Sequence, residues 1–195
     1  VSDALSDWVI DRWDVLADED MNHAHGTFIG GLAVAGASLN GAMTCPETDG
    51  AELVDVAIFP DEAGGAFASY YSGGLPHFFD EMEAAVADAR ARHGVRVFNM
   101  SLNILQPAAP DTYSAHAVRL DRIAEDNNAV IFMSAGNIRP QDLRPEWSAD
   151  PATSLAGLAA ARNDGLLTPA ESARNVAVAA LNPTGHDGCV ALAPA

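Results

Sequence analysis

The chain has 195 residues, 49% of them hydrophobic, which is enough to bury the core of a single domain over residues 1–195 and argues against disorder. Its 27 acidic residues outnumber its 10 basic ones, and the net charge of −17 argues against nucleic acid and anionic membrane surfaces as partners. The apolar runs are too short to span a membrane, and residues 1–10 do not form a signal peptide, so the localisation stays unknown.

Strand-like and helix-like segments alternate along the chain, which predicts an α/β fold with a mostly parallel sheet. Residues 28–39 are rich in Gly and Ala and have the length of a helix, and we expect this helix to be buried close to the sheet. Residues 53–59 alternate apolar side chains and end at Pro60, as a strand does.

The middle of the chain predicts helices over 77–94 and 113–128 and strands over 95–102 and 129–135, with Gly94 as a helix C-cap. The continuous apolar run of the second strand indicates burial on both faces of a parallel sheet. The helical spacing assigns these buried positions: Phe78, Met82, Ala85, Val86 and Ala89 in the first helix, and Ala117, Leu120, Ile123 and Ala124 in the second.

The last third begins with residues 138–167, which are rich in Pro, Asp and Arg and predict a long surface excursion with a helical piece near 153–162. Residues 168–171 have the form of a capping box with Pro169 at the first helical position, which predicts a short helix. Residues 175–181 predict the last strand.

Three short motifs fall at helix entrances or at the carboxyl ends of strands, where open parallel sheets bind their ligands. They are His25-Gly26-Thr27 before the small-residue helix, "VFNMSLN" at 97–103, and "IFMSAGN" at 131–137. Taken one at a time, each has an ordinary structural interpretation. His25 can be a half-buried polar residue, residues 101–103 a plain strand end, and Asn137 a turn residue that tolerates a left-handed conformation.

The same residue types also suit catalysis. A histidine at a helix N-terminus meets the positive end of the helix dipole, which favours the neutral ring that a general base needs. Gly26 allows close approach, and the hydroxyl of Thr27 can cap the first turn. The side-chain amide of Asn137 can donate a hydrogen bond to a developing oxyanion, an interaction worth about 3 kcal/mol, and residues 101–103 can pair with an extended peptide.

In this order along the chain, the three motifs resemble those of the subtilisin-like serine proteases, and "SARNVAVAALNPTGHDG" resembles the segment that follows them there. The resemblance implies a three-layer subtilisin-like α/β fold and hydrolysis of a polypeptide substrate bound in extended conformation. It implies His25 as general base, Asn137 as oxyanion donor, and Ser101, Leu102 and Asn103 as the substrate-binding strand. Asn103 stands where the family usually has Gly. The resemblance therefore does not predict the depth of the specificity pocket.

Two parts of the family's machinery have no convincing match. The family's aspartate ends a strand well upstream of the histidine, whereas Asp11 lies only 14 positions before His25 and is followed by Arg12 instead of a small turn residue. The nucleophile motif Gly-Thr-Ser occurs nowhere in the 195 residues. We therefore expect the chain to be the central portion of a catalytic domain, incomplete at both ends and inactive as it stands.

Two alternatives stay open. One is a pseudoprotease or binding module that holds extended peptides in the substrate-strand groove without turnover. The other is an unrelated α/β domain, which a sheet that is not contiguous through 53–59, 95–102, 129–135 and 175–181 would favour.

No cofactor is expected. The resemblance allows structural calcium, but the acidic residues show no ligand loop. His23 fits a loop residue better than a metal ligand. Cys45 and Cys189 are too few for a disulfide framework and lack metal-ligand spacing. The remaining histidines are interpreted as surface residues or caps, namely His77, His93, His116 and His186.

Overall fold

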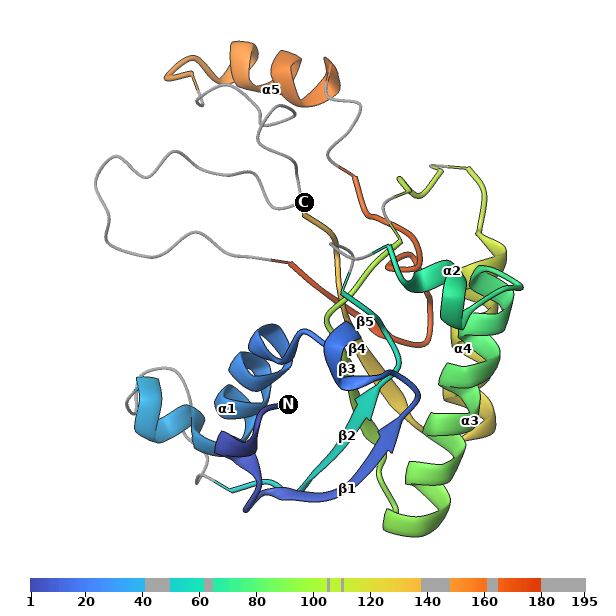
Figure 1. Cartoon of the computed structure of the whole chain (residues 1–195). Helices are drawn as coiled ribbons and strands as arrows, with labels where there is room; N and C mark the ends of the chain where they lie inside the picture. The colour runs from blue at the N-terminus through green and yellow to red at the C-terminus, as the bar shows by residue number, and fades with distance from the viewer. Residues whose placement is uncertain are drawn as a thin grey trace. The chain divides into compact units, whose positions relative to one another are not determined.

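A computed structural model describes residues 1–40, 50–61, 65–104, 106–109, 111–137, 148–160 and 165–179. The chain divides into two compact units, Val1–Arg92 and His93–Ala195 (Figure 1). In both units parallel strands alternate with helices, as expected for an α/β fold, while the single domain over 1–195 stays a prediction. Within the described ranges, no helix combines the length and apolar character needed to cross a bilayer.

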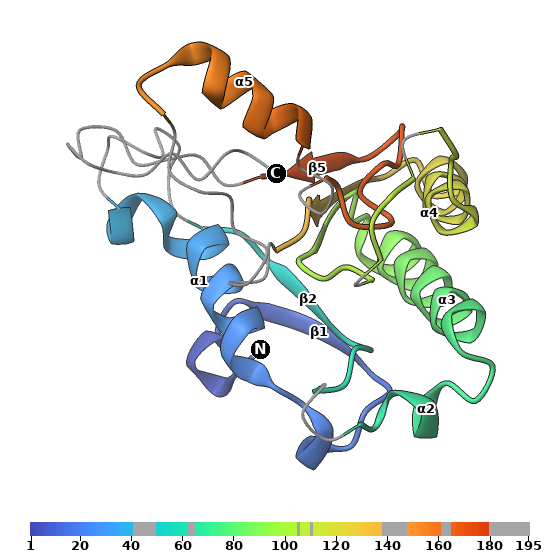
Figure 2. The ribbon, with the colours of Figure 1, turned by 90° about the horizontal axis from the view of Figure 1, so that it is seen from above.

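The first unit is built on two parallel strands with a helix on each face. Figures 1 and 2 both show α1 on one side of the strands β1 and β2 and α3 on the other. The strands pair with Asp11 opposite Val54 and Asp14 opposite Ala57. The elements are, in chain order, η1 (Asp3–Leu5), β1 (Val9–Asp14), η2 (Asp18–Asp20), α1 (His23–Asn40), β2 (Leu53–Ala57), α2 (Phe67–Tyr70) and α3 (Leu75–His93).

Helix α1 covers the predicted small-residue helix and extends it at both ends, but a kink interrupts it at Ala35, whose φ of −137° and ψ of 30° are not helical. Gly30 lets the helix come close to its neighbours, because a Cβ there would lie 2.8 Å from Cδ1 of Leu5 and 3.4 Å from Cδ1 of Leu53. The expected burial holds for one face only: Val34 is 1% exposed, whereas Phe28 is 63% exposed. Gly30, on the side that faces Leu5 and Leu53, is buried like Val34.

Helix α3 is amphipathic, and the apolar positions assigned to it from the sequence are all buried. Gly94, with a φ of +71°, ends the helix as the predicted C-cap. The first turns of α3 contribute to an aromatic cluster. Within this cluster the pKa of Tyr71 is raised to about 12, mainly by burial and secondly by the nearby Glu81 carboxylate. The rings of the cluster come from Phe59, Phe67, Tyr71, His77, Phe78 and Phe79.

The second unit holds a three-stranded parallel sheet in the order β3-β4-β5. Each strand lies within a predicted one, although residues 180 and 181 fall outside the described ranges. A contiguous parallel sheet was expected through four predicted strands. Three of them, β3, β4 and β5, form such a sheet, whereas β2 pairs with β1 in a separate two-stranded sheet. The elements are β3 (Val97–Met100), α4 (Ala115–Asp126), β4 (Val130–Ser134), α5 (Pro151–Ala160) and β5 (Val176–Val178).

Helix α4 and strand β4 supply much of the buried interior of this unit. The four positions assigned to the apolar face of α4 are between 0% and 2% exposed. In β4, Ile131 and Met133 are buried, while Val130 and Phe132 are only half-buried. Burial on both faces, inferred from the continuous apolar run, is therefore wrong, because alternate side chains of a strand point to opposite faces.

Helix α5 confirms the helical piece near 153–162 but begins two residues earlier. Asp150 sets its start, accepting hydrogen bonds from the N–H groups of Ala152 and Thr153 at 3.3 and 3.1 Å. The short helix expected at 168–171 is wrong. These residues form a turn after a cis Thr168–Pro169 peptide, and the Thr168 hydroxyl lies 3.4 Å from a carboxylate oxygen of Glu171 instead of capping an amide.

Asp121 on α4 holds the segment that leads into β5. Its carboxylate accepts hydrogen bonds from the hydroxyls of Ser172 and Tyr113 and from the backbone N–H groups of Ala173 and Arg174. Burial raises the pKa of this carboxyl, but the hydrogen bonds outweigh burial, and the pKa of Asp121 ends below its usual 3.8. The folded unit therefore favours the ionised carboxylate.

We expect Asp121→Asn to lower the free energy of unfolding by about 2 kcal/mol at pH 7, since the amide turns a donor toward groups that are themselves donors. A carboxyl whose folded pKa is depressed stabilises the fold above its unfolded pKa, and this stabilisation is lost as the pH falls through the folded pKa. The difference between wild type and variant should thus shrink below about pH 4 in urea titrations. Exposed Asp126 on the same helix is the control, and a pH-independent difference contradicts the prediction.

Candidate active site

His25 lies in the first turn of α1 and is exposed. The cap of this turn comes from Asn22, whose side-chain oxygen accepts a hydrogen bond from the N–H of Ala24 at 3.1 Å. The expectation that Thr27 caps the turn is wrong, because its hydroxyl oxygen accepts instead from the N–H of Ser2 at 2.7 Å. The position of His25 at a helix N-terminus is as predicted.

The connection that leads into α1 is fastened from two sides. The hydroxyl of Tyr70 accepts a hydrogen bond from the N–H of Ala17 at 2.9 Å and donates one to the carboxylate of Asp20 at 2.8 Å. The carbonyl of Asp20 accepts from the N–H of Asp61, also at 2.9 Å. Helix α2 and the segment after β2 thereby set where the first turn of α1, with His25, begins.

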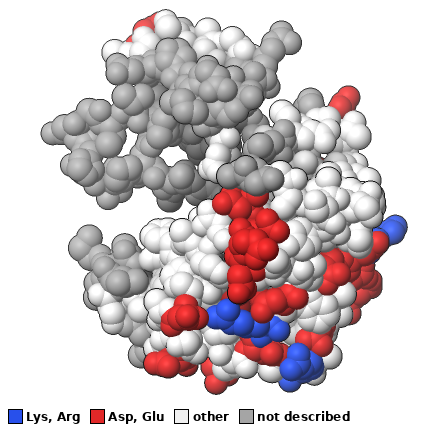
Figure 3. Space-filling model, viewed as in Figure 1, with Lys and Arg blue, Asp and Glu red and all other residues white. Residues whose placement is uncertain are grey.

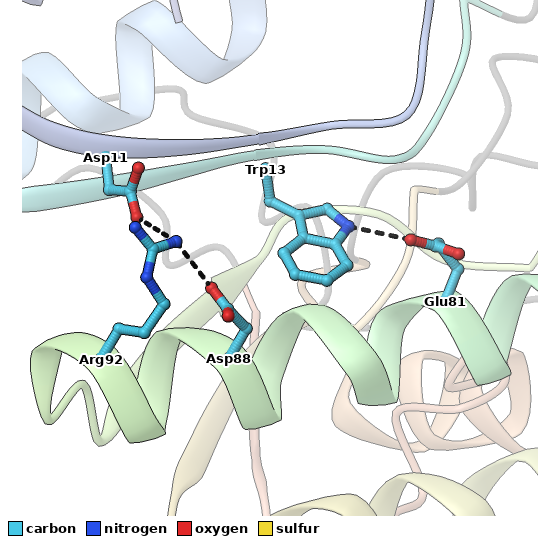
Figure 4. A network of polar contacts seen from close by, with 5 residues as sticks. All are labelled: Asp11, Trp13, Glu81, Asp88 and Arg92. Carbon is cyan, nitrogen blue, oxygen red and sulfur yellow. Dashed lines mark hydrogen bonds and ion pairs between the residues drawn. The ribbon is translucent and has the colours of Figure 1, made fainter.

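Asp11 is directed away from the helix that bears His25. Figure 4 shows its carboxylate pointing from β1 toward α3, where Arg92 forms an ion pair with it at 2.7 Å and also meets Asp88 at 3.1 Å. Beside it the indole of Trp13 donates to Glu81 at 2.8 Å. Because α1 and α3 lie on opposite faces of β1, Asp11 ties a strand to a helix and does not orient His25.

Residues 101–103 follow directly after β3 and are half-buried. The side-chain amide of Asn99 donates to the hydroxyl of Ser101 at 2.8 Å, which steadies the start of the segment. Within the described residues, the backbone N–H groups of Leu102 and Asn103 have no backbone acceptor. Successive N–H groups of an extended segment point to opposite edges, so one of the two can pair with an extended chain added on one side.

Asn137 lies three residues beyond the end of β4 and is exposed. The sharp change of direction before it belongs to Gly136, which has a φ of +123° and whose N–H donates to the hydroxyl of Ser134 at 3.1 Å. Among the described residues, Asn128 is the one non-glycine with positive φ. Asn137 therefore does not adopt the left-handed conformation that its interpretation as a turn residue allowed.

A strip at 166–168, of which the sequence analysis assigned a role only to Thr168, as part of a capping box, runs beside the continuation of the 101–103 segment. Leu166 and Thr168 accept backbone hydrogen bonds from Ala108 at 2.8 Å and Ile104 at 2.9 Å, and Thr168 also donates to Gln106 at 2.9 Å. Pro107 and Leu167 pair in antiparallel fashion between them. The strip thereby anchors the chain that follows Asn103.

The structure places residues 101–103 and Asn137 at the same edge of one sheet. They follow β3 and β4, which pair in parallel with Met100 opposite Met133, so both segments leave the carboxyl ends of adjacent strands. His25 belongs to the first unit. The surface in Figure 3 carries far more acidic than basic side chains, yet the described residues include no cluster of three or more His, Cys, Asp or Glu able to hold a metal ion, and we assign no calcium site.

Comparison with known proteins identifies the class. Residues 6–186 match the family model described as the subtilase family, peptidase S8. The chain therefore belongs to the subtilase family, and its mixture of helices and parallel sheets agrees with a subtilisin-like α/β fold.

Among solved structures, the prenylagaramide maturation protease PagA is similar to this chain, with a TM-score of 0.43 and 18% identity. The similarity covers 94% of this chain and 57% of that one, so the chain spans a little more than half the length of PagA. No curated protein matches this chain significantly.

Proposed function

We propose that this chain is the part of a subtilisin-like serine endopeptidase that carries the general base, the oxyanion donor and the substrate-binding strand. The observation that carries the proposal is the subtilase match over residues 6–186, a range that contains His25, residues 101–103 and Asn137. The catalytic serine and aspartate come from sequence outside these 195 residues.

In the proposed reaction the serine hydroxyl attacks the scissile carbonyl and His25 accepts its proton. Asn137 donates a hydrogen bond to the oxyanion of the tetrahedral intermediate. When the carbon–nitrogen bond breaks, His25 returns the proton to the leaving amine, and water then releases the acyl group from the serine by the reverse sequence. The exposure of both side chains supports these roles, since each has to reach a substrate.

The substrate in this proposal is a polypeptide in extended conformation. The N–H groups of Leu102 and Asn103, which have no backbone acceptor among the described residues, support this, because one of the two can donate to a carbonyl of an extended peptide. Side chains of such a peptide alternate in direction, so its backbone can pair while one side chain enters the specificity pocket. Asn103, which stands where the family usually has Gly, then affects which substrate side chain fits this pocket.

The decisive experiment compares the 195-residue chain with the same chain flanked by its natural neighbouring sequence. We expect only the flanked protein to react with a fluorophosphonate probe and to cleave a fluorogenic peptide library, because an acyl-enzyme needs the serine. His23→Gln in α1 is the control and should leave both signals unchanged.

Two outcomes contradict the proposal. Labelling of the 195-residue chain by itself would mean a different nucleophile. A flanked protein that binds extended peptides without labelling or turnover would favour the pseudoprotease or binding module instead. Fluorescence anisotropy with a labelled peptide measures that binding independently of catalysis.

A further inference from the structure

Leu167 contacts both residues that precede Asn137. Its backbone N–H donates to the carbonyl of Ala135 at 2.9 Å. Its side chain lies directly against Gly136, where an added Cβ would come within 2.5 Å of Cγ and 3.0 Å of Cβ of Leu167. Because the side chain of Leu167 fills the space where a Cβ of residue 136 would lie, the backbone before Asn137 has little room to move.

Leu167 is itself held in place. The residues on either side of it, Leu166 and Thr168, are hydrogen-bonded to the segment 104–108, which continues directly from Asn103. On the other side, Ala135 extends the pairing of β4 with β5 by donating to the carbonyl of Val178 at 2.9 Å. Leu167 therefore links the backbone before Asn137 to the backbone after the candidate substrate strand.

We infer that Leu167 is a positioning residue for Asn137: by packing on Gly136 it fixes the backbone from which the oxyanion donor projects, relative to residues 101–103. The inference rests on the proposed function for the role of Asn137. It requires no contact of Leu167 with substrate, because it rests on the contacts of Leu167 with Ala135 and Gly136.

The kinetic test is a double-mutant cycle in the flanked, active protein. Leu167→Ala should lower kcat by roughly 10- to 100-fold with little change in KM, since a donor displaced by about 1 Å loses this much. In an Asn137→Ala background the same change should have no further effect on kcat. Leu167→Met, which keeps most of the packing volume, should retain nearly full activity. Equal losses in both backgrounds would overturn the inference.

A second readout does not need activity. Leu167→Ala in the 195-residue chain should speed amide hydrogen exchange at Gly136 and Asn137 while Ile131 and Met133 in β4 keep their protection. If Leu167→Ala does not fold, Leu167→Val takes its place in both tests. Unchanged exchange overturns the inference, whatever the kinetics show. If Asn137→Ala leaves kcat intact while exchange responds as expected, the proposed function fails and the packing role of Leu167 survives.

Discussion

Replacing His25 with alanine in the flanked enzyme is expected to lower kcat by about 10⁶-fold, the size found for the corresponding base in subtilisin. Without the imidazole, no group takes the proton from the serine as it attacks or returns it to the leaving amine. KM should change little, because His25 does not hold the substrate. Steady-state kinetics on a fluorogenic peptide, with active sites counted by titration, measure both constants.

The matched control is His23→Ala, which removes an identical side chain two positions earlier in the same helix. Its kcat should stay within about threefold of wild type, since surface changes away from the chemistry are usually small. If His25→Ala keeps kcat within about tenfold of wild type, His25 is not the general base. Loss of activity in both variants would indicate instead that the start of α1 had been disturbed.

Gly136→Ala should destabilise the 195-residue chain by on the order of 4 kcal/mol. Two causes act together. An L-residue is strained at a φ of +123°, and its Cβ would lie 2.5 Å from Cγ of Leu167, an atom too near the backbone to move aside cheaply. Urea denaturation followed by circular dichroism measures the loss.

Gly30→Ala is the control for this prediction because it also introduces a close contact, at 2.8 Å, but with Cδ1 at the tip of Leu5. Its backbone is helical, and alanine gains up to about 1 kcal/mol over glycine there. We expect a net change below about 1 kcal/mol. Equal destabilisation by the two variants would show that the clash and strain at Gly136 do not matter.

Periodic features of the fold could be predicted from the sequence. The buried faces of α3 and α4 follow from apolar side chains at helical spacing, and Gly94 ends α3 because glycine adopts its φ of +71° without strain. Both helices have one apolar face and one polar face. Their local pattern and their tertiary environment therefore agree, and pattern alone suffices.

The errors lie where tertiary partners decide. The pattern at 168–171 satisfies the rule for a helix start, but hydrogen bonds from 104–108 hold the chain before it in extended form. In β4 an unbroken apolar run concealed the difference between its two faces. Thr27 was available as a cap by residue type, yet Asn22 stands at the actual first turn. Local sequence does not contain this information.

The same distinction applies to the candidate site. His25 and Asn137 could be singled out because their motifs are short and contiguous in the chain. Leu167 could not, since its role depends on a contact with Gly136, 31 positions earlier, and on backbone bonds to the segment 104–108. The sequence pointed to this contact only through Gly136, because a glycine before Asn137 indicates a turn. It did not indicate which residue packs on that turn.

The partners of β1 also determine when this strand can be secured during translation. Its ladder partner β2 comes more than forty residues later, and Trp13 and its acceptor Glu81 are 68 positions apart. At 5–20 residues per second, the ribosome takes roughly 3–14 s to cover that second interval. Until β2 has been made, β1 is an unpaired strand, and its charged residues Asp11, Arg12 and Asp14 oppose pairing with the wrong chain. The side-chain partners Glu81 and Arg92 on α3 follow only later.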